Sequence, residues 1–286
     1  MTTSQFVPQD GTAQELIYKT VNDRPLELSF RPPTRQVYDR APVYFLIPGG
    51  GWHSETRASM LDFSRLSAAV LREQGFAVVG VDYRVTSTAP GTTIDDEVSD
   101  VMDAARYLAH HADTLGIDSR RLVTSGHSAG GHLALMLALA PHDRFRRDSV
   151  LTDDFTVAAC AAISPVAFLY AGGDCPTPMF SDADGLYAGG VYDDAAAHRC
   201  SPYDYITADS VPTLFVHGTH DQLVNFDNSR VSYRRGVQLG AAFELVTPQN
   251  GGHGLESRVE GAHTYPSFDT VQRLIAAWIT GAIAQN

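Results

Sequence analysis

The sequence predicts an α/β domain with a mainly parallel central sheet and helices on both of its faces. The first observation behind this prediction is an alternation along the chain. From Val43 onward, short apolar runs that suit buried strands take turns with longer segments of helical periodicity. The second observation is size, because 286 residues, 44% of them hydrophobic, suffice for one large core. A chain of this mass hides about 70% of its extended surface on folding.

The expected strands are apolar runs bounded by turn-forming residues. Glu15–Val21 and Leu26–Phe30 flank the turn Asn22–Pro25, which predicts an antiparallel hairpin. Val43–Ile47 is an unbroken apolar run closed by Pro48 and three glycines, as is typical of a strand buried on both faces. The remaining strands are expected at Phe76–Val81, Arg121–Ser125, Val157–Ile163, Thr213–His217 and Ala242–Val246.

The expected helices lie between these strands or after them. The helix from Met60 is expected to stop before Gly75, and the helix from Ala129 to stop at Pro141, since both residue types end helices. Ile94–Leu115 carries apolar residues on one helical face and acidic residues around it. In chain order, the helices are expected at Met60–Gln74, Ile94–Leu115, Ala129–Ala140, Asn228–Gln238 and Phe268–Ala284.

The alternation breaks between Ser164 and Val211, in a stretch rich in Gly, Pro, Asp and Tyr that is too long for an ordinary connection. We interpret residues 165–210 as a small lid over the ligand end of the sheet, so the chain is expected to form a single domain, 1–286. The aromatic residues of this stretch suit stacking on a sugar or aryl ring, and equally suit packing of the lid. They are Phe168, Tyr170, Tyr187, Tyr192, Tyr203 and Tyr205.

Charge and composition exclude several classes of protein. The formal charge of −12 disfavours a phosphate backbone, so no nucleic-acid partner is expected. The longest apolar run, Leu133–Ala140, is far shorter than the roughly 20 residues of a membrane helix, so no membrane partner is expected. The N-terminus has neither the basic start nor the apolar segment of a secretory signal.

Three cysteines, Cys160, Cys175 and Cys200, form an odd and sparse set without a C-x-x-C motif. Such a set disfavours a disulfide framework and a structural zinc site, and it fits a reducing compartment. A cytoplasmic location is therefore expected.

The strongest chemical signal is Gly126-His127-Ser128-Ala129-Gly130, which stands between a predicted strand and a predicted helix. In this context G-x-S-x-G is typical of a nucleophile elbow, where a tight strand–turn–helix reversal presents the serine hydroxyl. The glycines leave room where backbone segments pack without Cβ atoms. Since a serine hydroxyl is a weak nucleophile, Ser128 needs a base to take its proton.

A carboxylate and a histidine follow downstream in the chain order that such sites use. Asp221 lies just past the expected strand Thr213–His217, and His253 lies between glycines past the next strand. Loops at the carboxyl ends of parallel strands converge, so Ser128, Asp221 and His253 are expected to meet. His263 stays an alternative base.

A metal site is the competing interpretation of the histidines near Asp221. His217 and His220 form an H-x-x-H-D pattern with it, but zinc needs a third strong ligand. We expect His217 to be a strand-end residue with its hydrogen bonds satisfied and His220 to be exposed. No metal is predicted.

An oxyanion hole is expected at the glycines that follow Val43–Ile47. Backbone N–H groups aimed at a developing negative charge stabilise it, and glycine lets the backbone approach a ligand closely. The expected donors are the N–H groups of Gly50 and Gly51, together with that of Ala129 after the serine. Trp52 is expected either to contact the substrate or to belong to the core.

These motifs resemble the α/β-hydrolase fold family of esterases and lipases. The resemblance covers Val43 to the C-terminus. Pro48-Gly49-Gly50-Gly51-Trp52 is similar to the family's H-G-G-G-W oxyanion motif, with Pro48 in place of the histidine that props the loop. The other matching motifs are Asp82-Tyr83-Arg84, the elbow Gly126–Gly130, the acid loop His217–Asp221 and the base loop Gly251–Gly254.

Within this family the chain resembles the small-lid branch of acetyl-xylan esterases, feruloyl esterases and arylformamidases. The resemblance implies hydrolysis of carboxylic esters, of sugars or aryl alcohols, through an acyl-Ser128 intermediate without a cofactor. Short acyl groups, from acetyl to butyryl, are expected because the lid stretch shows no long amphipathic helix that could open over a lipid surface. His253 would be the base and Asp221 its orienting acid, while Asp82 and Arg84 would be structural. The expected partner is a small-molecule ester. An arylformamidase-like amide hydrolase, a peptidase and a non-catalytic binding protein on the same scaffold are the alternatives.

Overall fold

The computed structural model describes residues 12–54, 56–170 and 193–285. Its centre is a sheet of eight strands in the order β1-β2-β4-β3-β5-β6-β7-β8. Antiparallel pairing is confined to β1 with β2 and β2 with β4, and the other neighbouring strands pair in parallel. The strands are β1 (Gln14–Val21), β2 (Arg24–Arg31), β3 (Ala41–Ile47), β4 (Ala77–Val81), β5 (Ile117–His127), β6 (Val157–Ile163), β7 (Thr213–Val216) and β8 (Phe243–Val246). This arrangement confirms the predicted mainly parallel sheet.

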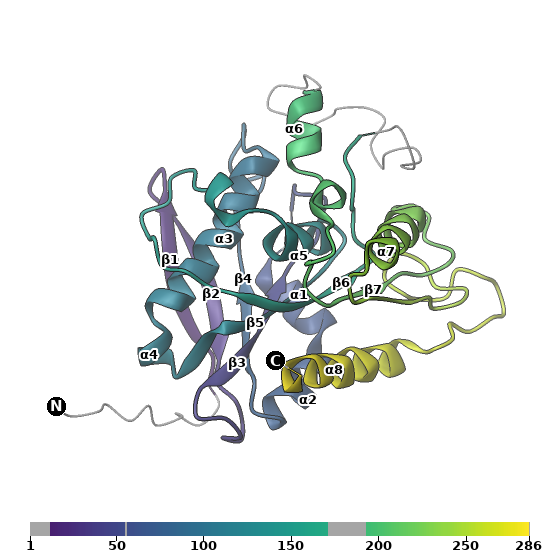
Figure 1. Cartoon of the computed structure of the whole chain (residues 1–286), viewed down its shortest axis with the longest axis horizontal. Coiled ribbons are helices and arrows are strands. Elements are labelled where there is room, and N and C mark those ends of the chain that lie inside the picture. Colours follow the sequence, from purple (N-terminus) through teal and green to yellow (C-terminus); the bar gives the residue numbers. More distant parts are fainter. Residues whose placement is uncertain (1–11, 55, 171–192, 286) are drawn as a thin grey trace.

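The helices cover both faces of the sheet, as Figure 1 shows, with α8 and α2 on one face and α3 and α5 on the other. They are α1 (Arg57–Phe63), α2 (Arg65–Glu73), α3 (Ile94–His110), α4 (Ala112–Leu115), α5 (Ala129–Leu139), α6 (Asp194–Arg199), α7 (Asp227–Leu239) and α8 (Phe268–Ala284). None of the described helices is long and apolar enough to cross a membrane.

The central strands are apolar throughout because both of their faces are covered. In β3, Val43, Phe45 and Ile47 join the core cluster on the face of α3 and α5, while Tyr44 and Leu46 join the cluster on the face of α2 and α8. All five side chains are fully buried. Alternate residues of a strand point to opposite faces, so one apolar run serves two cores.

Two expected helices are each divided in the structure. The segment expected as Met60–Gln74 is α1 and α2, separated at Ser64, and Ile94–Leu115 is α3 and α4, separated at His111. At both junctions the backbone leaves helical ψ for a value near zero, while main-chain hydrogen bonds continue across it. Hydrophobic spacing persists through such a one-residue kink, so the sequence pattern does not register it.

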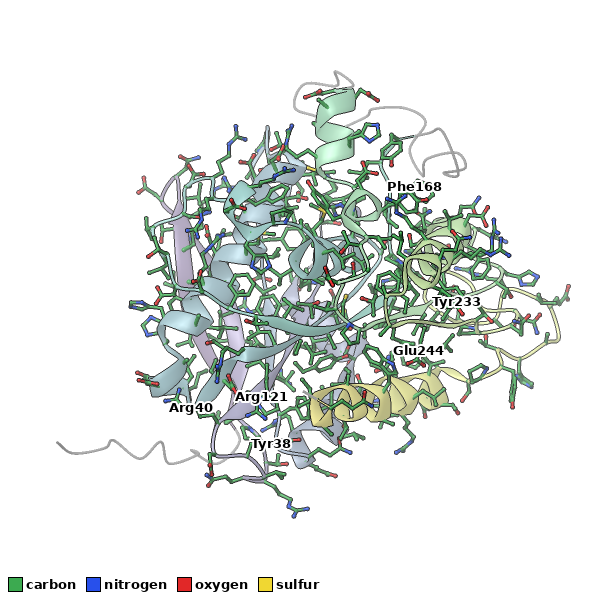
Figure 2. The ribbon with its side chains drawn as sticks, in the orientation of Figure 1. Tyr38, Arg40, Arg121, Phe168, Tyr233 and Glu244 are labelled. Carbon is green, nitrogen blue, oxygen red and sulfur yellow. The ribbon has the colours of Figure 1, made fainter. Side chains whose placement is uncertain are left out.

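The part of the expected lid before residue 171 packs into the body of the protein, as does the segment around Tyr203. Residues 164–170 are buried, and the Phe168 ring, labelled in Figure 2, contacts Tyr203 edge-on at 6.1 Å between centroids. Tyr203 lies on a short 3-10 helix, Pro202–Tyr205, which follows α6. Of the aromatic residues in this stretch, Phe168, Tyr170 and Tyr203 therefore serve packing. Tyr187, Tyr192, Cys175 and the middle of the expected lid lie outside the described residues.

The two described cysteines, Cys160 and Cys200, are free and buried.

Candidate active site

Ser128 occupies a tight turn between β5 and α5, with φ 60° and ψ −123°. A non-glycine residue in this region of backbone space costs about 1–3 kcal/mol and is held there by its surroundings. Its N–H donates to the carbonyl of Ile163 at 2.9 Å. A Cβ at Gly126 would lie 2.2 Å from the carbonyl oxygen of Gly130, and one at Gly130 would lie 2.1 Å from that of Ile47. The turn therefore requires both glycines of the motif.

Asp221 and His253 lie in the loops after β7 and β8, and their side chains meet. The Nδ1–H of His253 donates to Oδ2 of Asp221 over 2.8 Å. The other carboxylate oxygen of Asp221 accepts the backbone N–H groups of Leu223 and Val224, each at 2.9 Å. These bonds fix the carboxylate, and the carboxylate in turn fixes the orientation and the tautomer of the imidazole.

The carboxylate of Asp221 is fully buried yet stays ionised. Burial by itself raises the pKa of Asp221, but hydrogen bonds from His217 and His253 oppose it, and the pKa of Asp221 falls well below its ordinary value. An ionised partner favours the imidazolium that forms when His253 takes a proton.

His217 is a buried neighbour of this pair. Its Nε2 lies 3.1 Å from Oδ2 of Asp221, and its Nδ1 lies 2.8 Å from the hydroxyl of Ser229. His217 is thus satisfied at the strand end, as expected, and His220 is exposed. Among the described residues, no group of three or more His, Cys, Asp or Glu side chains is arranged to hold a metal ion.

Ser128 and His253 line the same cavity, which has a volume of about 520 Å³. Between these two described residues the structure has no hydrogen bond, as is common before a substrate draws such groups together. His263 is exposed and is not among the described residues that line this cavity. The other described lining residues are Gly49, Gly50, Gly51, Ser59, Met60, Phe63, His127 and Leu223.

The glycine loop after β3 forms the wall beside Ser128. Gly50 and Gly51 have φ values of 88° and 61°, in the left-handed region that glycine adopts freely. Their N–H groups have no acceptor among the described residues. Ala129 is the first residue of α5, where an N–H has no acceptor within the helix. The three expected oxyanion donors thus flank Ser128 with unused N–H groups.

Tyr83 holds this loop, and it is the residue that the sequence analysis missed. Its hydroxyl lies 3.0 Å from the carbonyl oxygens of both Pro48 and Gly49. The buried tyrosine thus holds the loop from the end of β4, the strand next to β3. The sequence feature that could have pointed to Tyr83 is its place in the Asp82-Tyr83-Arg84 motif. Asp82 pairs with Arg57 and Arg84 pairs with Asp100, as structural residues do.

Trp52 lies in the core. Its side chain is 3% exposed, and its indole N–H donates to Nδ1 of His132 at 3.3 Å. The described lining of the cavity does not include it. Trp52 was expected either to bind substrate or to belong to the core, and the structure places it in the core because its indole packs against α5 beneath the loop.

Fold and site together define the class of this chain as an α/β-hydrolase of the esterase type. The family model described as BD-FAE matches residues 30–235, so the chain belongs to that family.

Relatives and solved structures agree with this assignment. The chain is 29% identical to the esterase LipC of Mycobacterium tuberculosis over 81% of this chain and 57% of that one. It is 29% identical to the probable carboxylic ester hydrolase LipM of the same organism, over 70% and 46%. The chain thus spans about half the length of these curated relatives. Esterase 2 of Thermogutta terrifontis superposes with a TM-score of 0.74, at 25% identity and 97% coverage of both chains.

Proposed function

We propose that this chain hydrolyses carboxylic esters through an acyl-Ser128 intermediate. The observation that carries the proposal is the 2.8 Å bond from His253 to a buried, ionised Asp221, on the cavity that Ser128 also lines. A nucleophile, an oriented base and unused N–H donors thereby surround one space. The names of the relatives support ester hydrolysis.

The reaction follows from these positions. Nε2 of His253 takes the proton of Ser128 as the serine oxygen bonds to the ester carbonyl carbon. The resulting oxyanion accepts the N–H groups of Gly50, Gly51 and Ala129. The imidazolium then gives its proton to the departing alcohol oxygen as the carbon–oxygen bond breaks. Water, deprotonated by His253, attacks the acyl-serine and releases the acid, and the proton returns to Ser128.

We propose acyl groups from acetyl to butyryl as substrates, on sugars or aryl alcohols. The cavity that Ser128 lines is also lined by the apolar residues Met60, Phe63 and Leu223. Met60 and Phe63 lie on the short helix α1. Structures of the Thermogutta esterase hold propionate or butyrate, acids of the proposed size.

We also propose that the chain is a single domain with a lid at about 165–210. Two free thiols support a reducing compartment such as the cytoplasm.

A series of p-nitrophenyl esters tests this substrate proposal. We expect kcat/KM for acetyl and butyryl esters to exceed that for the decanoyl ester by at least about tenfold, because a long acyl chain does not fit the apolar part of the cavity. The leaving group stays the same along the series, so rates report the acyl pocket alone. Acetylated sugars measured in parallel report the alcohol side. Faster hydrolysis of the decanoyl ester would contradict the assignment to short acyl groups.

A further inference from the structure

The main chain of His253 is held separately from its ring. The carbonyl oxygen of His253 lies 2.8 Å from Nε2 of His127 and 3.0 Å from the hydroxyl of Ser164. His127 is the last residue of β5, and Ser164 follows β6 directly. The two strands next to each other in the sheet thus each send one side chain to the same oxygen.

Both side chains must act as donors, because a carbonyl oxygen only accepts hydrogen bonds. His127 therefore carries a proton on Nε2. Burial, and after it the neighbouring imidazole of His253, lower the pKa of His127 to about 4. The hydrogen bond to the His253 carbonyl and the charge of Asp221 raise the pKa of His127, and His217 lowers it, each with a smaller effect. Above about pH 5 His127 is consequently a neutral donor.

The two donors are themselves fixed. Ser164 is fully buried with φ 43°, and its N–H donates to the carbonyl of Val216 at 2.8 Å. A serine kept at positive φ in the core indicates a place that the surroundings hold firmly. The imidazole of His127 stacks on Phe63 at 4.8 Å, and its centroid lies 4.5 Å from that of His253. These contacts hold both donors beside the carbonyl of His253.

We propose that His127 and Ser164 are positioning residues that hold the backbone of the base loop in the place from which the ring of His253 closes on Ser128 when substrate binds. His127 precedes Ser128 directly in the chain, so its bond to His253 joins base and nucleophile without passing through the acid. Asp221 sets the orientation of the His253 ring, whereas His127 and Ser164 set the position of the His253 backbone. The inference rests on the proposed function, because a base has a position to keep only if Ser128 reacts.

Four variants separate the roles of donor and ring. His127→Phe keeps an aromatic ring against Phe63 and removes the donor, whereas His127→Gln keeps an N–H at a similar reach. Ser164→Ala removes the second donor with little change in volume. We expect kcat to fall about tenfold in His127→Phe and about 100-fold in the double variant with Ser164→Ala, with KM within about twofold, since misplacement by about 1 Å is worth about 100-fold. His127→Gln should recover most of the loss.

The rate of reaction with a fluorophosphonate probe is measured beside turnover, and circular dichroism checks that each variant folds. A parallel fall of probe rate and kcat in His127→Phe, restored in His127→Gln, supports positioning. Equal losses in His127→Phe and His127→Gln, or a change in KM alone, would overturn it. A wild-type chain that neither reacts with the probe nor hydrolyses the esters would instead overturn the proposed function. Failure of the positioning proposal and failure of the proposed function are therefore distinguishable.

Discussion

Ser128→Ala is expected to lower kcat for p-nitrophenyl acetate by about 10⁶-fold, because removal of the nucleophile leaves only the oxyanion donors and substrate binding. The elbow itself should persist, since alanine keeps the Cβ of serine, and the strained turn depends on the glycines on either side. Initial rates with the purified variant, corrected for spontaneous hydrolysis, measure the effect.

Ser210→Ala serves as the control for Ser128→Ala. The hydroxyl of Ser210 accepts the backbone N–H of Thr207 at 2.9 Å, and Ser210 does not line the described part of the cavity. Its activity should equal that of the wild type. Residual activity of Ser128→Ala within tenfold of the wild type would show that another group is the nucleophile.

His253→Ala is expected to lower kcat about as much as Ser128→Ala does, since the two residues act as one unit. His263→Ala is the matched control and should keep full activity. The exposed His263 stands ten positions further on, and its carbonyl oxygen accepts a hydrogen bond from the side-chain amide of Asn250, just before the base loop. The reverse outcome would make His263 the base.

The same two variants are expected to differ in their pH profiles. A base must be neutral to accept a proton, so kcat/KM should rise with pH in a single limb between about pH 6 and 8, where imidazoles titrate. Asp221 does not contribute to this limb. Burial raises its pKa, but the hydrogen bonds from His217 and His253 outweigh that effect and keep the pKa of Asp221 well below this range. His127, with a pKa of about 4, does not contribute either. The limb should vanish in His253→Ala and persist in His263→Ala.

The strands and the chain order of the site were predictable because both follow from local patterns. Continuous apolar runs mark strands buried on two faces, and β6 has the bounds expected from such a run. Helical spacing of apolar residues marks helices, and α8 has the bounds expected from it. The carboxyl ends of parallel strands share one edge of the sheet, so residues in the loops after β5, β7 and β8 had to approach one another. Topology alone therefore brought Ser128, Asp221 and His253 to one place.

The contacts that set distances within the site were not predictable. Tyr83 props Pro48, and Ser164 binds the carbonyl of His253, through hydrogen bonds between residues 35 and 89 positions apart. Neither contact leaves a periodic trace in the sequence. Trp52 shows the same limit, because a large aromatic residue after a glycine loop suits a cavity wall as well as the core. Only the packing of its indole on His132 decides.

Trapping of the acyl-enzyme tests the central claim most directly. The chain is mixed with p-nitrophenyl butyrate and quenched in acid within the first turnovers. The acid protonates His253, which stops deacylation. Peptide mapping by mass spectrometry then locates the added group. The proposed mechanism predicts one butyryl group per chain, on Ser128, and none in Ser128→Ala. Turnover without an acylated Ser128, or with the acyl group on another residue, would contradict it.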